Sequence, residues 1–206
     1  PPVPRRKAVL LFAGDHGVAA RGVSVATSDV TRQMVFNFVA GGAGINVLAR
    51  QTGARVTVVD AGIQSELPPL RRLVRGKIRP GTADLSVGPA MTRAEAEAAL
   101  ALGVRCVEEE VAQGLDLLAC GEMGIGNTTP ATAMICAVTG ASPGQATGLG
   151  TGIPETARAR KIALIESALA VNRPDPSDGL DLLAKIGGLE IAAMTGAMLQ
   201  GAVRRV

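Results

Sequence analysis

Three apolar segments that end in glycine-containing loops constrain this chain more than any other feature of its sequence. The segments are Lys7–Ala13, Ala54–Asp60 and Leu115–Cys120, and an acidic residue lies at or just after the end of each. A continuous apolar run of this length is typical of a parallel strand that is buried on both faces. Because helical stretches separate the runs, the sequence predicts an α/β fold, a Rossmann-like parallel sheet flanked by helices in three layers.

The helical stretches carry recognisable start signals. Thr92 and Glu95 form a capping-box pattern at the start of a long helix that Gly114 is expected to end. Ser28 is predicted to cap a helix that runs from Asp29 to Val39. The remaining predicted helices are Gly44–Gln51, Thr128–Val138, Glu155–Val171, Asp178–Ile186 and Leu189–Arg205.

The segment Gln64–Pro89 is rich in proline and charge, and we expect irregular structure there with one short strand. No internal repeat or flexible linker divides the sequence, so residues 1–206 are predicted to form a single α/β domain. No apolar run approaches the roughly 20 residues that span a bilayer. The basic start of the chain imitates a signal peptide, but the apolar run after it is too short. The prediction is a cytoplasmic protein that does not enter a membrane.

The residues that usually bind metals or nucleic acids are scarce. The three cysteines form no C-x-x-C pair and His16 is the only histidine, which argues against a zinc or haem site. We therefore predict no metal and no cofactor. The net charge is +3, but tryptophan and tyrosine are absent, so platforms for stacking bases are nearly lacking. A nucleic-acid partner is not expected, and small anionic ligands fit the charge better.

Acidic and histidine side chains stand where the predicted strands end. Asp15 and His16 follow the first strand, Asp60 ends the second, and Glu122 follows the third. In open parallel sheets, ligands bind beyond the carboxyl ends of the strands. These loops are therefore expected to converge on one cleft.

The loop Gly121–Thr129 (GEMGIGNTT) is the most informative motif. Glycines let the backbone approach a ligand, and the free N–H groups at a helix start attract an anion. Its spacing nearly matches a nucleoside-triphosphate-binding loop, but Asn127 replaces the lysine that such a loop requires. A cradle for a single phosphate remains, with a turn needed only for tight strand–helix packing as the alternative.

A second glycine turn, Gly148–Glu155, leads into another predicted helix. Lys161 lies about two turns into that helix and could supply a positive charge to a phosphate, although most lysines are simply solvated. Glu122 is unusual in an anion-binding turn: it either caps a backbone group or faces a cation such as a pyridinium. His16 could equally be a general base or a structural donor.

Several motifs together resemble one enzyme family. The stretch from Gly14 to Ile63, PAMTRAEAEAAL, GEMGIGNTTPATA, GTGIPETARARK and KIGGLEIAAMTGAML occur in the order found in nicotinate-nucleotide:dimethylbenzimidazole phosphoribosyltransferases. The resemblance covers nearly the whole chain. It implies transfer of the phosphoribosyl group of nicotinate mononucleotide to 5,6-dimethylbenzimidazole, which yields α-ribazole 5′-phosphate and nicotinate in cobalamin biosynthesis, without a metal.

The resemblance also implies roles for individual residues. Glu122 would assist catalysis or hold a substrate. The benzimidazole pocket would be lined by Ser24, Gln33 and Met123. The phosphate and ribose would be surrounded by Gly124, Gly126, Asn127, Gly150, Thr151, Gly152 and Lys161. Asp15, His16 and Asp60 lie in matching motifs but receive no role, and the family's members are homodimers.

The ends of the chain depart from the family pattern. The family's general-base glutamate is expected beyond Val206, and an N-terminal helical segment is expected before Pro1; neither Glu166 nor Glu190 lies in the motif of that base. A non-catalytic nucleotide-binding fragment is therefore an alternative to the enzyme. Another phosphate-dependent enzyme on a similar sheet, such as a sugar-phosphate isomerase, is a second alternative.

Overall fold

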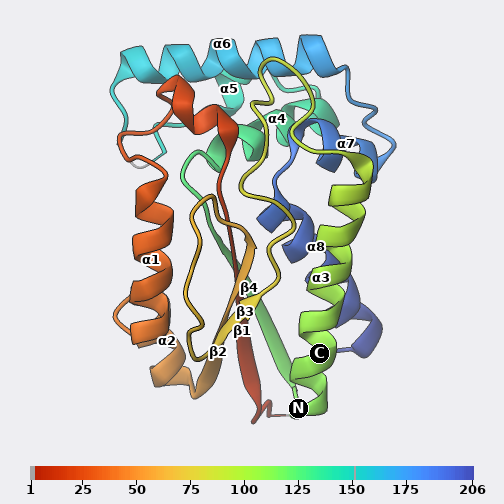
Figure 1. Cartoon of the computed structure of the whole chain (residues 1–206). Coiled ribbons are helices and arrows are strands. Elements are labelled where there is room, and N and C mark those ends of the chain that lie inside the picture. Colours follow the sequence, from red (N-terminus) through yellow and green to blue (C-terminus); the bar gives the residue numbers. More distant parts are fainter. Residues whose placement is uncertain (1–2, 151) are drawn as a thin grey trace.

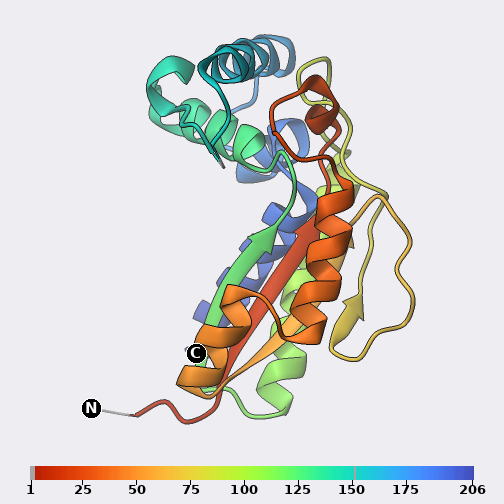
Figure 2. The ribbon, with the colours of Figure 1, turned by 90° about the vertical axis from the view of Figure 1, so that its left-hand side faces the viewer.

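A four-stranded parallel sheet forms the centre of the computed structural model, which describes residues 3–150 and 152–206. The strands are β1 (Lys7–Gly14), β2 (Ala54–Gly62), β3 (Leu73–Arg75) and β4 (Leu117–Met123), and their order across the sheet is β3-β2-β1-β4. All three strand pairs are parallel. The predicted α/β class is confirmed, and helices lie on both faces of the sheet (Figures 1 and 2).

One face of the sheet is covered by the long helices α3 (Arg93–Ala112) and α8 (Leu189–Arg204). Glycines allow the two helices to pack very closely: a Cβ atom on Gly103 would lie 1.8 Å from the Ala193 carbonyl oxygen, and one on Gly196 would lie 2.1 Å from that of Leu100. The largest apolar cluster lies between these helices and the sheet and includes Phe12 of β1. This helix pair gives β1 and β4 a firm support on that side.

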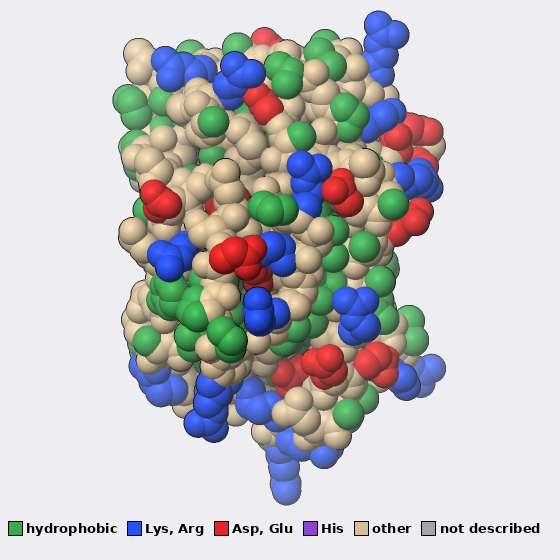
Figure 3. Space-filling view, in the orientation of Figure 1, with side chains coloured by type: hydrophobic (Ala, Val, Ile, Leu, Met, Phe, Trp, Pro, Cys, Tyr) green, Lys and Arg blue, Asp and Glu red, His purple; other side chains and the backbone are tan. Residues whose placement is uncertain are grey.

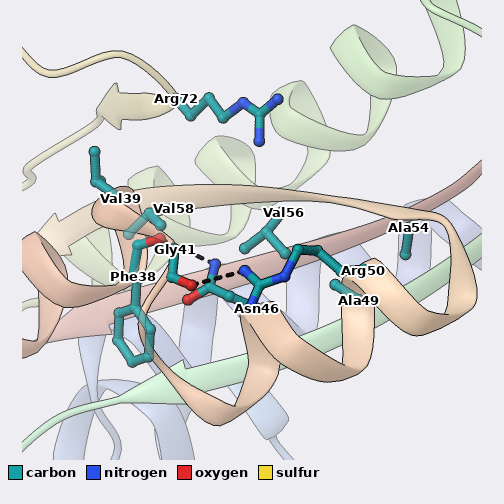
Figure 4. A pocket seen from close by; sticks show the side chains of 10 residues that line it. All are labelled: Phe38, Val39, Gly41, Asn46, Ala49, Arg50, Ala54, Val56, Val58 and Arg72. Atoms are coloured by element: carbon teal, nitrogen blue, oxygen red, sulfur yellow. Dashed lines mark hydrogen bonds between the residues drawn. The ribbon is translucent and has the colours of Figure 1, made fainter.

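The opposite face is covered by α1 (Asp29–Ala40) and α2 (Gly44–Thr52). Their apolar residues form two smaller clusters with β1 and β2. A cavity of about 130 Å³ remains between these helices and β2, where Arg50 donates to the Gly41 carbonyl oxygen over 2.7 Å (Figure 4). Its lining shares no residue with the glycine-loop cavity described below.

A third group of helices caps the carboxyl ends of the strands (Figure 2). It contains α4 (Thr128–Thr139), α5 (Pro143–Ala146), α6 (Glu155–Asn172) and α7 (Gly179–Ile186). A separate apolar cluster joins α4, α6 and α7 to the 3-10 helix η1 (Gly17–Arg21), with Ile165 and Leu182 among its buried members. The cap has its own core, and it holds α4 and α6 above the ends of β1 and β4.

Most predicted helix boundaries agree with the structure to within one or two residues. The Thr92–Glu95 capping box forms as predicted, because the Thr92 side chain accepts from the Glu95 N–H and Glu95 reaches back to the Thr92 N–H. Ser28 holds the N-cap position of α1 as predicted, but its backbone is already helical and its side chain makes no capping hydrogen bond. The short helices η1 and α5 were not predicted.

The third predicted strand begins and ends two to three residues later than expected. β4 continues through Met123, so Glu122 lies in the strand and not in the turn, which corrects the placement inferred from the motif. Glu122 pairs in register with Phe12 of β1 and therefore faces the α3–α8 side of the sheet. Because Glu122 lies in the strand, its carboxylate need not oppose an anion bound in the following loop.

The surface shows charges of both signs. On the face drawn in Figure 3, Lys and Arg side chains are interspersed with Asp and Glu rather than gathered into one basic stripe. Among the described residues, no helix combines the length and the apolar character that a membrane crossing requires.

Candidate active site at the ends of β1 and β4

The glycine loop between β4 and α4 fits closely against the end of β1. A Cβ atom on Gly124 would lie 2.2 Å from the Gly14 carbonyl oxygen and 3.1 Å from the His16 ring, so only glycine fits there. Gly126 has a φ of 90°, which other residues rarely adopt. The Ile125 N–H donates to the hydroxyl of Thr31, a buried residue of α1. The glycine loop is therefore fixed by close packing against the end of β1 and by a contact with α1.

A small cavity of about 70 Å³ opens above this loop. The first turn of α4 and the loop form its floor, and α6 forms its opposite wall. Its lining residues are Val23, Ser24, Gly124, Ile125, Gly126, Asn127, Thr128, Gly150, Ile153 and Lys161. The cavity thus brings together residues from both glycine turns.

Lys161 is the cation of this cavity. The residue is only 2% exposed, and its Nζ atom donates to the Thr128 hydroxyl at the start of α4. Among the described residues, no carboxylate lies within ion-pair distance of Nζ. Burial lowers the pKa of this lysine. The view that Lys161 is an ordinary solvated lysine is therefore wrong, and within the described part of the chain the cavity holds a lysine with no carboxylate beside it.

His16 and Glu190 form a buried pair beneath the loop. The side chains of both are fully buried, and His16 Nε2 lies 2.8 Å from Glu190 Oε1. That oxygen also accepts from Asn127 Nδ2 over 2.7 Å. The ring N–H is poorly aligned with the carboxylate for a hydrogen bond, and the two groups form an ion pair when the imidazole is protonated. Burial opposes the charged imidazole, but the charges of Glu190 and Asp15 outweigh it and raise the pKa of His16.

Asp15 connects the ends of β1 and β2. Its Oδ2 atom accepts from the Gln64 N–H over 2.8 Å, and the neighbouring Thr31 hydroxyl also contacts the carboxylate. Burial raises the pKa of this carboxyl despite both contacts. Asp15 is thus a buried structural acceptor at the base of the site.

Glu122 is exposed at the end of β4. Atoms packed around its carboxyl raise its pKa, the charge of Glu190 adds to this effect, and His16 opposes it. Among the described residues no hydrogen bond or ion pair engages the carboxylate. An accessible carboxyl with a raised pKa can accept a proton from a bound substrate.

Asp60 does not join the other strand-end residues, which corrects the expectation of one common cleft. Its side chain lies on the α1 side of the sheet, where it accepts from the Ile63 N–H and lies 3.8 Å from Lys77. It lines a separate pocket with Lys77, Glu66 and Leu67. Side chains alternate along a strand, so a residue at the end of a strand can face away from the cleft.

A second pocket, of about 460 Å³, adjoins the cavity at Ser24. Residues of η1 and the loop that follows it line most of this pocket, and Gln64 lies at its edge. Ser24 lines both spaces, but Gln33 is exposed on α1 and lines neither of them. Met123 packs into the apolar cluster under α1 and also lines neither.

The second glycine turn is only partly placed in the site. Gly150 and Ile153 line the small cavity, and Gly152 directly precedes Ile153 in the sequence. Thr151 was predicted to contact the phosphate or ribose, and it lies outside the described residues. Two contributors were missed from the sequence, Glu190 and Thr31. A lone carboxylate within the apolar first turns of α8 was the available signal for Glu190.

Known proteins share the sequence and the fold of this chain. A family model described as Phosphoribosyltransferase matches residues 1–206. A nicotinate-nucleotide–dimethylbenzimidazole phosphoribosyltransferase from Roseiflexus sp. (strain RS-1) is 54% identical over 199 residues, which are 97% of this chain and 56% of that protein. The enzyme of the same name from Desulforudis audaxviator is 52% identical over 201 residues. The chain thus spans about 56% of the length of these curated relatives.

A solved structure shares the fold as well. The crystal structure of CobT from Thermus thermophilus superposes with a TM-score of 0.94 at 46% identity, covering 98% of this chain and 61% of that one. Since the family model matches the entire sequence, and a relative is 54% identical over 97% of it, this chain belongs to the phosphoribosyltransferase family.

Proposed function

We propose that the protein containing this chain transfers the phosphoribosyl group of nicotinate mononucleotide to 5,6-dimethylbenzimidazole. The products are α-ribazole 5′-phosphate and nicotinate. The observation that carries the proposal is the buried cation Lys161, which faces a glycine loop at a helix start and has no carboxylate partner among the described residues. The names of the relatives support the same assignment.

The small cavity is the proposed site of the nucleotide's 5′-phosphate. The start of α4 offers the positive end of a helix dipole, although the Thr129 and Ala131 N–H groups already donate to carbonyl oxygens of the preceding loop and Pro130 has no N–H. Lys161 adds a full charge, and Asn127 and the Thr128 hydroxyl add polar contacts. A phosphate there would supply the counter-charge that Lys161 lacks, which offsets the desolvation of the lysine.

The larger pocket beside Ser24 is the proposed site of the aromatic bases. Its walls include the apolar side chains Ala19, Ala20 and Val25, which suit the ring system of a benzimidazole. Ser24 lines both spaces, so a nucleotide held by its phosphate would place its ribose near the junction. Fixing the reactants in this way supplies much of the rate enhancement in such a transfer.

The chemistry requires one proton acceptor and no redox partner. The C1′–N bond of nicotinate mononucleotide breaks, and its electron pair returns to the pyridinium nitrogen, which needs no proton. An imidazole nitrogen of dimethylbenzimidazole forms the new C1′–N bond, and the azole loses its N–H proton to a base. We assign Glu122 a part in this step, through its exposed carboxyl with a raised pKa. The principal base is proposed to lie in the part of the relatives' length that these 206 residues do not span.

We also infer that the whole protein is a homodimer, as the family resemblance implies, and that it is cytoplasmic, in keeping with the short apolar run at the start of the sequence. Sedimentation of the purified full-length protein would check its oligomeric state. A monomer at working concentration would contradict the dimer without touching the proposed reaction.

The test of the function is product formation by the full-length protein. Nicotinate mononucleotide and dimethylbenzimidazole are supplied together, and nicotinate and α-ribazole 5′-phosphate are quantified chromatographically. Equal amounts of both products are expected, and none without the azole. Binding of the mononucleotide without turnover would support a non-catalytic nucleotide-binding protein instead. Turnover of a sugar phosphate with no affinity for benzimidazole would support an isomerase.

A further inference from the structure

Three elements that are far apart in the sequence meet at one buried carboxylate. His16 follows β1, Asn127 immediately precedes α4, and Glu190 lies in the first turn of α8. Glu190 Oε1 is 2.8 Å from the His16 ring and 2.7 Å from the Asn127 amide nitrogen. The three side chains therefore form one continuous polar contact beneath the glycine loop.

A fully buried carboxylate at this place requires an explanation. Glu190 is 0% exposed, and its helical neighbours Leu189, Ala192 and Ala193 are all buried in the main core. A buried ion pair stabilises a fold little more than apolar packing of the same volume does, because both charges must leave water. The first turn of a helix favours a carboxylate, but an exposed position would have the same benefit. Stability alone does not account for the pair.

The surroundings of the pair leave it little freedom. A Cβ atom on Gly188 would lie 2.6 Å from the His16 ring, and one on Gly124 would lie 3.1 Å from it. A Cβ atom on Gly14 would lie 2.8 Å from Glu190 Oε2. The imidazole and the carboxylate are thus enclosed by glycine backbone, and the Asn127 side chain links the carboxylate to the lining of the small cavity.

We propose that His16 and Glu190 are positioning residues that hold Asn127, and through it the glycine loop, in the conformation that receives the nucleotide's phosphate. The proposal rests on the function assigned to that loop above. His16 fixes the position of the Glu190 carboxylate, and that carboxylate in turn orients the Asn127 side-chain amide. Because Asn127 is the residue before α4, a tilt of its side chain moves the helix start that faces the phosphate.

Protonation of His16 gives the proposal a signature that a purely structural role would lack. The acidic groups that face the ring are Glu190 from α8, Asp15 from its own loop and Glu122 from β4. Burial lowers the pKa of His16, and these acids more than reverse that effect. The His16–Glu190 ion pair therefore forms below the raised pKa of His16 and is lost as the pH rises through that pKa. Affinity for the mononucleotide is expected to fall in the same range.

The experiment compares Glu190→Gln with Glu166→Gln in the full-length protein. The first change keeps the shape of the side chain and removes its charge, and the second removes a charge from an exposed position on α6. For Glu190→Gln we expect KM for nicotinate mononucleotide to rise about 10- to 100-fold, the range of one charge-assisted hydrogen bond. KM for the azole should stay near the parent value, and Glu166→Gln should match the parent in both.

The pH profile and a double mutant complete the test. The part of the alkaline fall in kcat/KM for the mononucleotide that reflects His16 should move to lower pH in Glu190→Gln and disappear in His16→Asn, whereas a fall caused by deprotonation of Lys161 should remain in both variants. In an Asn127→Ala background, Glu190→Gln should add little, because contacting residues are not additive. A parent-like KM and profile in Glu190→Gln would overturn the proposal. So would an equal effect in both backgrounds, or an unchanged alkaline fall in a folded His16→Asn protein.

A failure of the proposed function would be visible separately. Turnover by the parent tests the reaction itself. Calorimetric titration with nicotinate mononucleotide compares parent and variants without turnover, so the positioning role can be judged even if no product forms. If the parent binds no mononucleotide at all, the phosphate assignment fails, and the inference fails with it.

Discussion

The two glycine turns of the site differ in what supports them. In the turn after β4, a Cβ atom on Gly124 would collide with the backbone of β1, and one on Gly126 would lie 3.2 Å from the Ala19 side chain. In the turn before α6, added Cβ atoms on Gly148 and Gly152 would meet no described atom within 4 Å. Leu149 beside them is 49% exposed. The first turn is shaped by packing before any ligand arrives, whereas Gly148 and Gly152 of the second turn have open space around them.

Because of this difference, we expect the two turns to contribute differently to stability and to binding. A preformed loop loses little conformational entropy on binding, which favours affinity. An exposed turn can adapt to the ligand, but it loses conformational entropy when the ligand orders it. Substitutions in the first turn should therefore change both stability and binding, and substitutions in the second should act mainly on binding.

Gly124→Ala should have the largest effect. The added methyl group would lie 2.2 Å from a backbone oxygen that cannot move freely. Overpacking of this kind lowers the free energy of unfolding by roughly 1–3 kcal/mol or more. Urea denaturation would measure it, and affinity for the mononucleotide should be nearly lost. Gly148→Ala is the matched control, and a comparable loss of stability in that variant would contradict the contrast between the turns.

Glu122→Gln should reduce turnover next most strongly. Replacement of a group that takes part in proton transfer lowers the rate by about 100-fold or more. Since the side chain is exposed, the melting temperature should stay close to that of the parent. Because the pKa of Glu122 is raised, its carboxylate should be lost at a higher pH than that of an ordinary glutamate as the pH falls. The fall of kcat at acid pH that reflects this group should vanish in Glu122→Gln. An unchanged kcat with an unchanged acid fall would show that Glu122 takes no part in proton transfer.

Lys161→Met should weaken mononucleotide binding by about 10- to 100-fold, the contribution of one charge-assisted contact. Affinity for dimethylbenzimidazole, measured by fluorescence titration, should not change. The pKa of this lysine is lowered in the folded protein, so folding releases protons and the stability of the parent should rise with pH in the range where the lysine titrates. Lys161→Met should lack that dependence. Equal mononucleotide affinity in variant and parent would remove Lys161 from the site.

Gly152→Ala should have the smallest effect. Its φ of 95° is unfavourable for alanine, and the strain in a freely placed residue is about 1–2 kcal/mol. With no described neighbour near the added methyl group, the exposed turn can relax, so we expect a small change in the denaturation midpoint and a modest loss of mononucleotide affinity. A loss of stability as large as that of Gly124→Ala would show that the second turn is also fixed by packing.

Local signals in the sequence account for much of the fold. Continuous apolar runs marked β1, β2 and β4, and the capping box marked the start of α3, because strand burial and helix capping depend on nearby residues. Ser28 shows the limit of such a signal: it lies at the N-cap of α1, but its backbone is helical, and a side chain in that conformation does not cap the helix.

The sequence by itself also determined the chemical character of the site: a glycine loop at a helix start, with a lysine nearby. Residue type and spacing are enough for that, because the conformational freedom of glycine and the polarity of a helix start are local properties. Only the tertiary structure decided which side chains share the site. It buried Lys161 against Thr128, turned Asp60 away from the cleft and left Gln33 in solvent. It also brought Glu190 beneath Asn127, across 63 residues of sequence. Such contacts depend on the angle at which α8 crosses the sheet and on the strand alternation, and neither can be read from nearby residues.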